Sequence, residues 1–152
     1  MRRLAEAIYA LAIALWVGGA WAIGFIAAPS LFASIGDRVL AGELAGNLFV
    51  LIGWTGMACA AYLLAFLVAR KRWKALGSSV FWLVLAMLLL VLASHFGIQP
   101  ILAKMKAEAW PLSVMQSVAK DRFASWHGAA GGLFVLQGLL GAALVLLQDR
   151  GR

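Results

Sequence analysis

The chain has 152 residues, of which 64% are hydrophobic and 12% are charged, and its formal net charge is +7. Soluble domains carry about 25% charged residues, and a chain this short cannot cover so much apolar surface with its own core. The composition therefore excludes an ordinary soluble domain and predicts a lipid bilayer as the main partner. The basic residues gather at the ends of apolar runs and form no solvated basic face, which argues against a nucleic-acid partner. A single cysteine, Cys59, excludes an internal disulfide.

Four apolar runs are long enough to cross a bilayer, which takes about 20 residues of helix. In chain order they cover residues 4–28, 44–69, 77–103 and 123–147. We predict an all-α fold, an antiparallel four-helix bundle integral to the membrane, with residues 1–152 forming one domain. The first run passes an Ala-Trp-Ala triplet that resembles a signal-peptide cleavage site, but it continues beyond that triplet. We therefore interpret it as a retained helix.

The first run carries small residues at every fourth position. Helices in lipid associate through close contacts between small residues, so we expect this stripe to be the packing face; it consists of Ala10, Ala14, Gly18 and Ala22. Pro29 is expected to break or kink the helix. We predict an amphipathic connection over residues 29–49, and we expect Asp37 within it to cap the N-terminus of the next helix.

The second and fourth runs carry glycine stripes of the same kind. The second has Gly42, Gly46, Gly53, Gly56 and Ala60, and the fourth has Gly128 and Gly132 beside His127, Gly131, Gly138 and Ala142. The third run is bulky nearly all round and should face lipid widely. A small-residue face left over after folding would allow a homo-oligomer. Between the third and fourth runs, Trp110 and Pro111 mark an expected turn at the membrane surface.

The distribution of lysine and arginine predicts the orientation, because cytoplasmic loops carry an excess of both. Eight lie at the two termini and in the second loop, namely Arg2, Arg3, Arg70, Lys71, Arg72, Lys74, Arg150 and Arg152. Five lie on the opposite side, namely Arg38, Lys104, Lys106, Lys120 and Arg122. We expect a bacterial inner-membrane protein with both termini in the cytoplasm.

Polar residues inside apolar runs are costly and mark candidate sites. Five of them fall near the predicted outer ends of the second, third and fourth helices: Glu43, Asn47, His95, Gln99 and His127. Together with Gly128 and Gly131, they predict a polar pocket on the outer side. Tyr9, Thr55 and Gln137 are scattered elsewhere.

Three interpretations of the pocket stay open. Its side chains form hydrogen bonds that hold the helices in register, or they bind a solute or relay protons, or His95 and His127 ligate haem or a metal ion such as copper. The sequence has no G-x-S-x-G, H-E-x-x-H, C-x-x-C or phosphate-binding glycine loop, so nothing in it indicates an enzyme.

Several segments in their order along the chain resemble the transmembrane-protein-205-like family, whose bacterial members mostly bear a domain-of-unknown-function label. They are "LWVGGAWAIGFIAAPSLF", "GNLF", "GIQPILAKMK" and "RFASWHG". The resemblance runs over residues 15–147 and implies a four-helix membrane protein. A eukaryotic relative is associated with platinum-drug resistance and vesicle traffic, which implies export or metal handling. The matching positions are Pro29, Phe32, Asn47, Pro100, Phe123, His127 and Gly128. Members often have a serine soon after the His-Gly pair, whereas Ala129, Ala130 and Gly131 follow it here.

The "WVGG" element is also similar to the copper-resistance D proteins and the HemJ-type haem-pathway oxidases. In those families a histidine commonly lies about two turns before the tryptophan, and here Tyr9 takes that place. The resemblance therefore leaves only His95 and His127 as a ligand pair. Our prediction is a small transport- or resistance-associated membrane protein without a cofactor. The alternatives are a haem- or copper-binding redox protein and a structural or assembly subunit of a membrane complex.

Overall fold

The computed structural model describes residues 2–109 and 120–150, and within them only residues 35–37 and 78 lie outside helices. The helices join into four long segments, each long and apolar enough to cross a membrane: Arg3–Ser34, Arg38–Gly77, Ser79–Ala109 and Lys120–Leu147. The predicted all-α class and the four apolar helices are thus confirmed. Leucine, alanine and methionine, which dominate these segments, are among the strongest helix formers. The expected turn at Trp110 and Pro111 lies outside the described residues.

The first segment alternates between α-helical and π-helical turns. It runs through α1 (Arg2–Ile13), η1 (Ala14–Gly18), α2 (Gly19–Trp21), η2 (Ala22–Ala27) and α3 (Ala28–Ser34), and both η1 and η2 are π-helical. The expected break at Pro29 does not occur. Pro29 lies in the first turn of α3, where the missing N–H of proline is best tolerated.

The chain reverses direction at residues 35–37, and α4 (Arg38–Lys71) follows. The carboxylate Oδ1 of Asp37 accepts hydrogen bonds from the backbone N–H groups of Val39 at 2.8 Å and Leu40 at 3.3 Å. The predicted N-cap is confirmed. The connection expected over residues 29–49 is much shorter than predicted, because both of its flanks continue the neighbouring helices.

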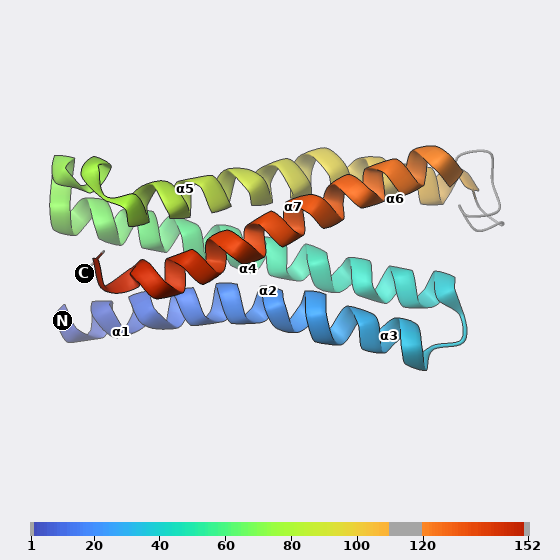
Figure 1. Cartoon of the computed structure of the whole chain (residues 1–152), viewed down its shortest axis with the longest axis horizontal. Helices are drawn as coiled ribbons and strands as arrows, with labels where there is room; N and C mark the ends of the chain where they lie inside the picture. The colour runs from blue at the N-terminus through green and yellow to red at the C-terminus, as the bar shows by residue number, and fades with distance from the viewer. Residues whose placement is uncertain (1, 110–119, 151–152) are drawn as a thin grey trace.

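The third and fourth segments complete the fold. A short 3-10 helix, η3 (Arg72–Gly77), leads from α4 to α5 (Ser79–Leu92), which continues through the π-helical η4 (Ala93–Ile98) into α6 (Gln99–Ala109). The fourth segment is α7 (Lys120–Leu147), followed by η6 (Gln148–Arg150). α7 begins beside α6 and crosses the molecule to end near α1 (Figure 1).

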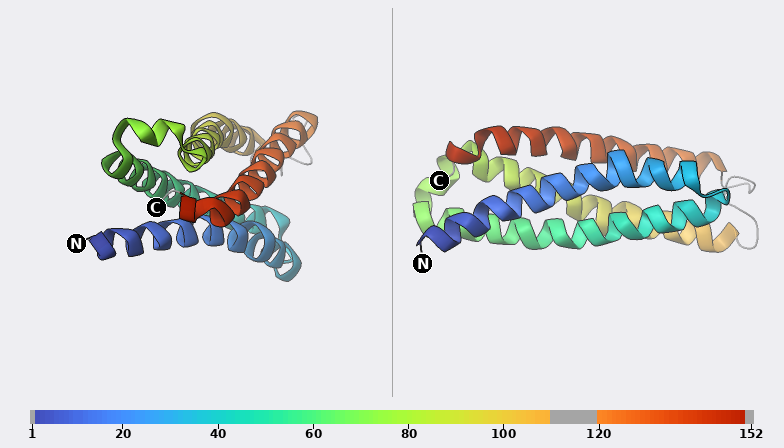
Figure 2. Two further views of the ribbon diagram at one scale, coloured as in Figure 1. Left: turned by 60° about the vertical axis from the view of Figure 1, so that its left-hand side comes forward. Right: turned by 90° about the horizontal axis from the view of Figure 1, so that it is seen from below.

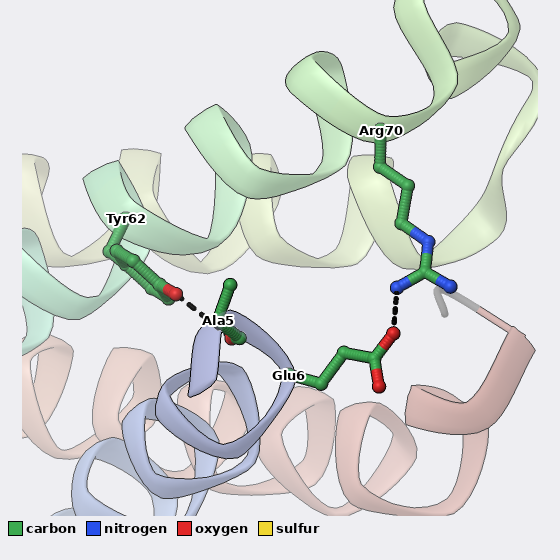
Figure 3. Close-up of polar contacts among 4 residues, drawn as sticks. All are labelled: Ala5, Glu6, Tyr62 and Arg70. Atoms are coloured by element: carbon green, nitrogen blue, oxygen red, sulfur yellow. Dashed lines mark hydrogen bonds and ion pairs between the residues drawn. The ribbon is translucent and has the colours of Figure 1, made fainter. Parts of the chain in front are cut away.

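The best-packed part of the molecule lies near its two chain ends, which are on the same side (Figures 1 and 2). Its largest fully buried side chains come from all four segments: Tyr9, Ile13, Trp16, Leu63, Leu67, Val80, Val84, Met87 and Leu144. Two polar contacts fasten α1 to α4 there (Figure 3). The Tyr62 hydroxyl donates to the carbonyl of Ala5 at 2.9 Å, and Arg70 pairs with Glu6 at 2.5 Å.

The small-residue stripes of α4 and of the first segment differ in whether they pack against another helix. In the first segment, Ala14, Gly18 and Ala22 are exposed, whereas Trp16 and Val17 are buried. The prediction that the small residues form its packing face is therefore wrong within this chain. In α4 the stripe does pack, because Gly53 and Gly56 receive large side chains from neighbouring helices and Ala60 is fully buried. Large side chains on one helix thus fill hollows on the other.

Candidate functional site

His95 lies in a hollow on the surface of α4. The π-helical turn η4 carries this half-buried imidazole toward α4, where its ring meets Trp54 edge-on, with the centroids 4.9 Å apart. A Cβ atom on Gly53 would lie 2.8 Å from Nδ1 of His95. The imidazole therefore occupies the space that a side chain at position 53 would fill, so a larger residue there would require the ring to shift.

Trp16 fills a second hollow close beside the first. It belongs to the π-helical η1, is 1% exposed and packs against Gly56. A Cβ atom on Gly56 would lie 2.9 Å from Cδ1 and 3.0 Å from Cε2 of the indole, and it would meet Nε1 as well. Two N–H-bearing rings, delivered by π turns of different segments, thus enter neighbouring hollows of one helix. Such π turns occur frequently at functional sites.

Both hollows lie near the middle of α4, about 24 Å along a helix of 34 residues. The nearby Thr55 hydroxyl is occupied, since it donates to the carbonyl of Leu51 in its own helix at 3.0 Å. The ring nitrogens of His95 and Trp16 are further polar groups at this height. An imidazole can donate or accept a hydrogen bond, carry a proton or bind a metal ion.

The other residues of the predicted pocket lie elsewhere. His127 is exposed and stacks on Phe123 of its own helix, with the ring centroids 5.8 Å apart. Gly128 and Gly131 have open space where a side chain would be. Glu43 and Asn47 are exposed on α4, and Gln99 is half-buried at the start of α6.

The structure does not bring His95 and His127 together. The rings of Phe49 and Phe134 are 5.4 Å apart and fix the relative height of α4 and α7. His127 lies seven residues before Phe134, and His95 packs beside Gly53, four residues beyond Phe49. At 1.5 Å per residue the two imidazoles are about 16 Å apart along the helix axes. The predicted polar residues are therefore spread along the helices, with Glu43 near the height of His127 and Asn47 between that height and the height of His95.

This separation bears on metal binding. Within residues 2–109 and 120–150, no group of three or more histidine, cysteine, aspartate or glutamate side chains could hold a metal ion. A site made from the described residues would thus have at most two ligands of these types. The distance between their heights is much longer than the roughly 4 Å that separates two ligands of one ion.

Sequence reasoning missed the importance of Trp16 and Gln137. The sequence analysis gave Trp16 no role, and the large residues spaced along its face are the signal that could have indicated its burial. Gln137 looked like a stray polar residue of the fourth helix. In the structure it is 8% exposed, and neither atom of its side-chain amide has a hydrogen-bond partner.

The hollows on α4 fall within a segment that is similar to known sequences. A family described as a domain of unknown function (DUF4149) matches residues 11–111, about two thirds of the chain. The chain belongs to the DUF4149 family. Its matched segment contains Trp16, Gly53, Gly56 and His95, whereas His127 and Gln137 follow it. No curated protein and no solved structure matched the chain.

Proposed function

We propose that this DUF4149 protein is an integral membrane protein that moves a small solute or protons, or supports resistance to a toxic solute. Its four segments would cross a bacterial inner membrane as an antiparallel bundle with both termini in the cytoplasm. The four apolar segments, with mean hydropathy of 1.9 to 2.3 in their most apolar windows, support this proposal. So do Trp73 and Trp82, which are exposed at the end where α4 joins α5, because tryptophan favours membrane interfaces.

The observation that carries a transport role is the position of His95. Its segment has the highest mean hydropathy of the four, yet His95 places a half-buried ionisable ring beside the middle of α4. Ionisable groups at such depth are expensive and usually face a pathway or a partner. His95 is then the deeper of two polar positions on a path, and His127 is an outer one. The sequence resemblance to the transmembrane-protein-205-like family would imply a role in export or resistance.

Proton flux into proteoliposomes tests this role. The purified protein is reconstituted with the pH-sensitive dye pyranine inside, and fluorescence is followed after a pH step. We expect His95→Gln to slow proton flux at least tenfold without lowering the melting temperature, while His127→Gln has a smaller effect. Unchanged flux combined with a lower melting temperature would instead support a structural role. A Soret band or stoichiometric copper in the washed protein would support the redox alternative.

Cysteine labelling tests the orientation. Gly36 lies in the turn between α3 and α4, and Lys74 lies in η3 between α4 and α5, at the opposite end of α4 (Figure 1). Both are exposed, and Cys59 is buried. In a Cys59→Ala background, Gly36→Cys should react with a membrane-impermeant maleimide on intact spheroplasts, and Lys74→Cys should react only after permeabilisation. The reverse pattern would place both termini outside the cytoplasm, and labelling of both positions from one side would contradict the bundle across the membrane.

A further inference from the structure

Gln137 is a buried polar side chain that the proposed transport path does not use. It is more than nine-tenths buried in α7, and both Nε2 and Oε1 lack a hydrogen-bond partner. Leaving a buried donor or acceptor without a partner is costly, and native proteins retain few such groups. An amide kept in this state indicates a partner that binds from outside the chain.

The amide faces a small space between three of the four segments. Its lining includes Trp16 and Trp21 from the first segment, Met87 from α5, and Gln137, Gly138 and Gly141 from α7; we call this space the Gln137 chamber. In this closed form it is too narrow for a water molecule, so water does not satisfy the amide.

Trp21 forms a partly exposed wall of the chamber. Trp21 is 43% exposed, and its Nε1 lies 3.3 Å from where a Cβ on Gly138 would be. Trp21 belongs to α2, which has three residues and lies between the π turns η1 and η2. Because this ring both lines the chamber and is partly exposed, we expect its rotation to open a way from the surroundings to the amide.

The chemistry of the lining defines the ligand. None of its residues carries a charge, so an ion would lose its hydration without gaining a partner. Nε2 of Gln137 needs an acceptor and Oε1 needs a donor, and a hydroxyl group supplies both. The two indoles and the thioether of Met87 favour a flat, apolar body. We propose that the Gln137 chamber binds a small, uncharged, lipid-soluble molecule that carries a hydroxyl group on a ring.

Quenching of tryptophan fluorescence tests the proposal, because two indoles line the chamber. The probes are 4-bromophenol, which has the ring and the hydroxyl group, and bromobenzene, which lacks the hydroxyl group. With the protein in lipid nanodiscs, we expect 4-bromophenol to quench saturably. Gln137→Leu should raise its half-saturating concentration about tenfold and should not weaken quenching by bromobenzene. The matched control Gln148→Leu, the same change near the chain end, should alter neither probe.

A second variant closes the chamber without removing the amide. A Cβ on Gly141 would lie 3.0 Å from Cγ1 of Val17 and 3.6 Å from Cε of Met87, so Gly141→Ala should abolish saturable quenching by both probes. Quenching by 4-bromophenol that is not saturable, or that is the same in native protein and Gln137→Leu, would overturn the proposal. If Gln137→Leu does not fold, unchanged saturable quenching in Gly141→Ala would overturn it. The experiment measures binding alone, so its outcome is independent of proton flux.

Discussion

The same substitution, glycine to alanine, should have opposite effects at Gly56 and Gly18. A Cβ atom at position 56 would lie within 3.0 Å of two carbon atoms of the Trp16 indole and would also meet its nitrogen. Trp16 is 1% exposed and cannot move aside without displacing its neighbours. A Cβ atom at position 18 would have nothing within 4 Å.

The structure allows a magnitude to be worked out for each variant. Overpacking a closed site costs about 1–3 kcal/mol, and Gly56→Ala belongs at the upper end because three atoms of a rigid ring are affected. Alanine is better than glycine in a helix by about 1 kcal/mol. We therefore expect Gly56→Ala to lower the free energy of unfolding by about 2 kcal/mol. Gly18→Ala should raise it by up to about 1 kcal/mol, since only the helix preference acts.

Reversible unfolding in mixed micelles, followed by circular dichroism as sodium dodecyl sulfate is added, measures both values. The expected gap between the two variants is about 3 kcal/mol, which is well above the precision of such titrations. Equal losses in the two variants, or a greater loss for Gly18→Ala, would show that the first helix packs through its small-residue stripe. The packing of Trp16 against Gly56 of α4 would then be wrong.

Further substitutions test the N-cap of α4 and the two polar contacts between α1 and α4. Asp37→Ala removes the N-cap of α4 and should cost about 1 kcal/mol in the same titration; Asp37→Asn, which keeps an acceptor, should cost clearly less, and equal losses would argue against capping. Tyr62→Phe removes the donor to the Ala5 carbonyl and should cost about 1 kcal/mol, with faster hydrogen exchange in α1; unaltered exchange there would contradict the contact. Glu6→Gln breaks a partly exposed pair with Arg70 and should cost less than about 1 kcal/mol. That cost should shrink in high salt, and a salt-independent effect would rule out an ion pair.

Much of the fold could be predicted from the sequence because its signals are local. Four apolar runs of sufficient length and a capping aspartate after Gly36 depend only on neighbouring residues, and the structure agrees with both. The choice of packing face is different. The first helix has small residues on one face and large residues on another, and only the hollows at Gly53 and Gly56 of another helix decide between them.

The sequence did not predict the heights of the candidate site residues along the helices, for a related reason. His95 looked close to a helix end because its apolar run was expected to stop at residue 103, but the helix continues to Ala109. His127 lies only seven residues into α7. The relative heights of two helices depend on side-chain contacts such as that between Phe49 and Phe134, which no count of residues from predicted ends can supply.

The π turns at residues 14–18 and 22–27 of the first segment, and at 93–98 of the third, change the direction in which side chains point along these two continuous helices. Each holds an extra residue, which rotates everything beyond it by about 100° relative to an uninterrupted α-helix. The first segment can thus direct Trp16 to α4 and, a few residues later, Trp21 to α7. Length changes of a single residue among DUF4149 proteins should accordingly cluster at these three turns. Anywhere else in a span, one added or lost residue would rotate half a helix away from its neighbours.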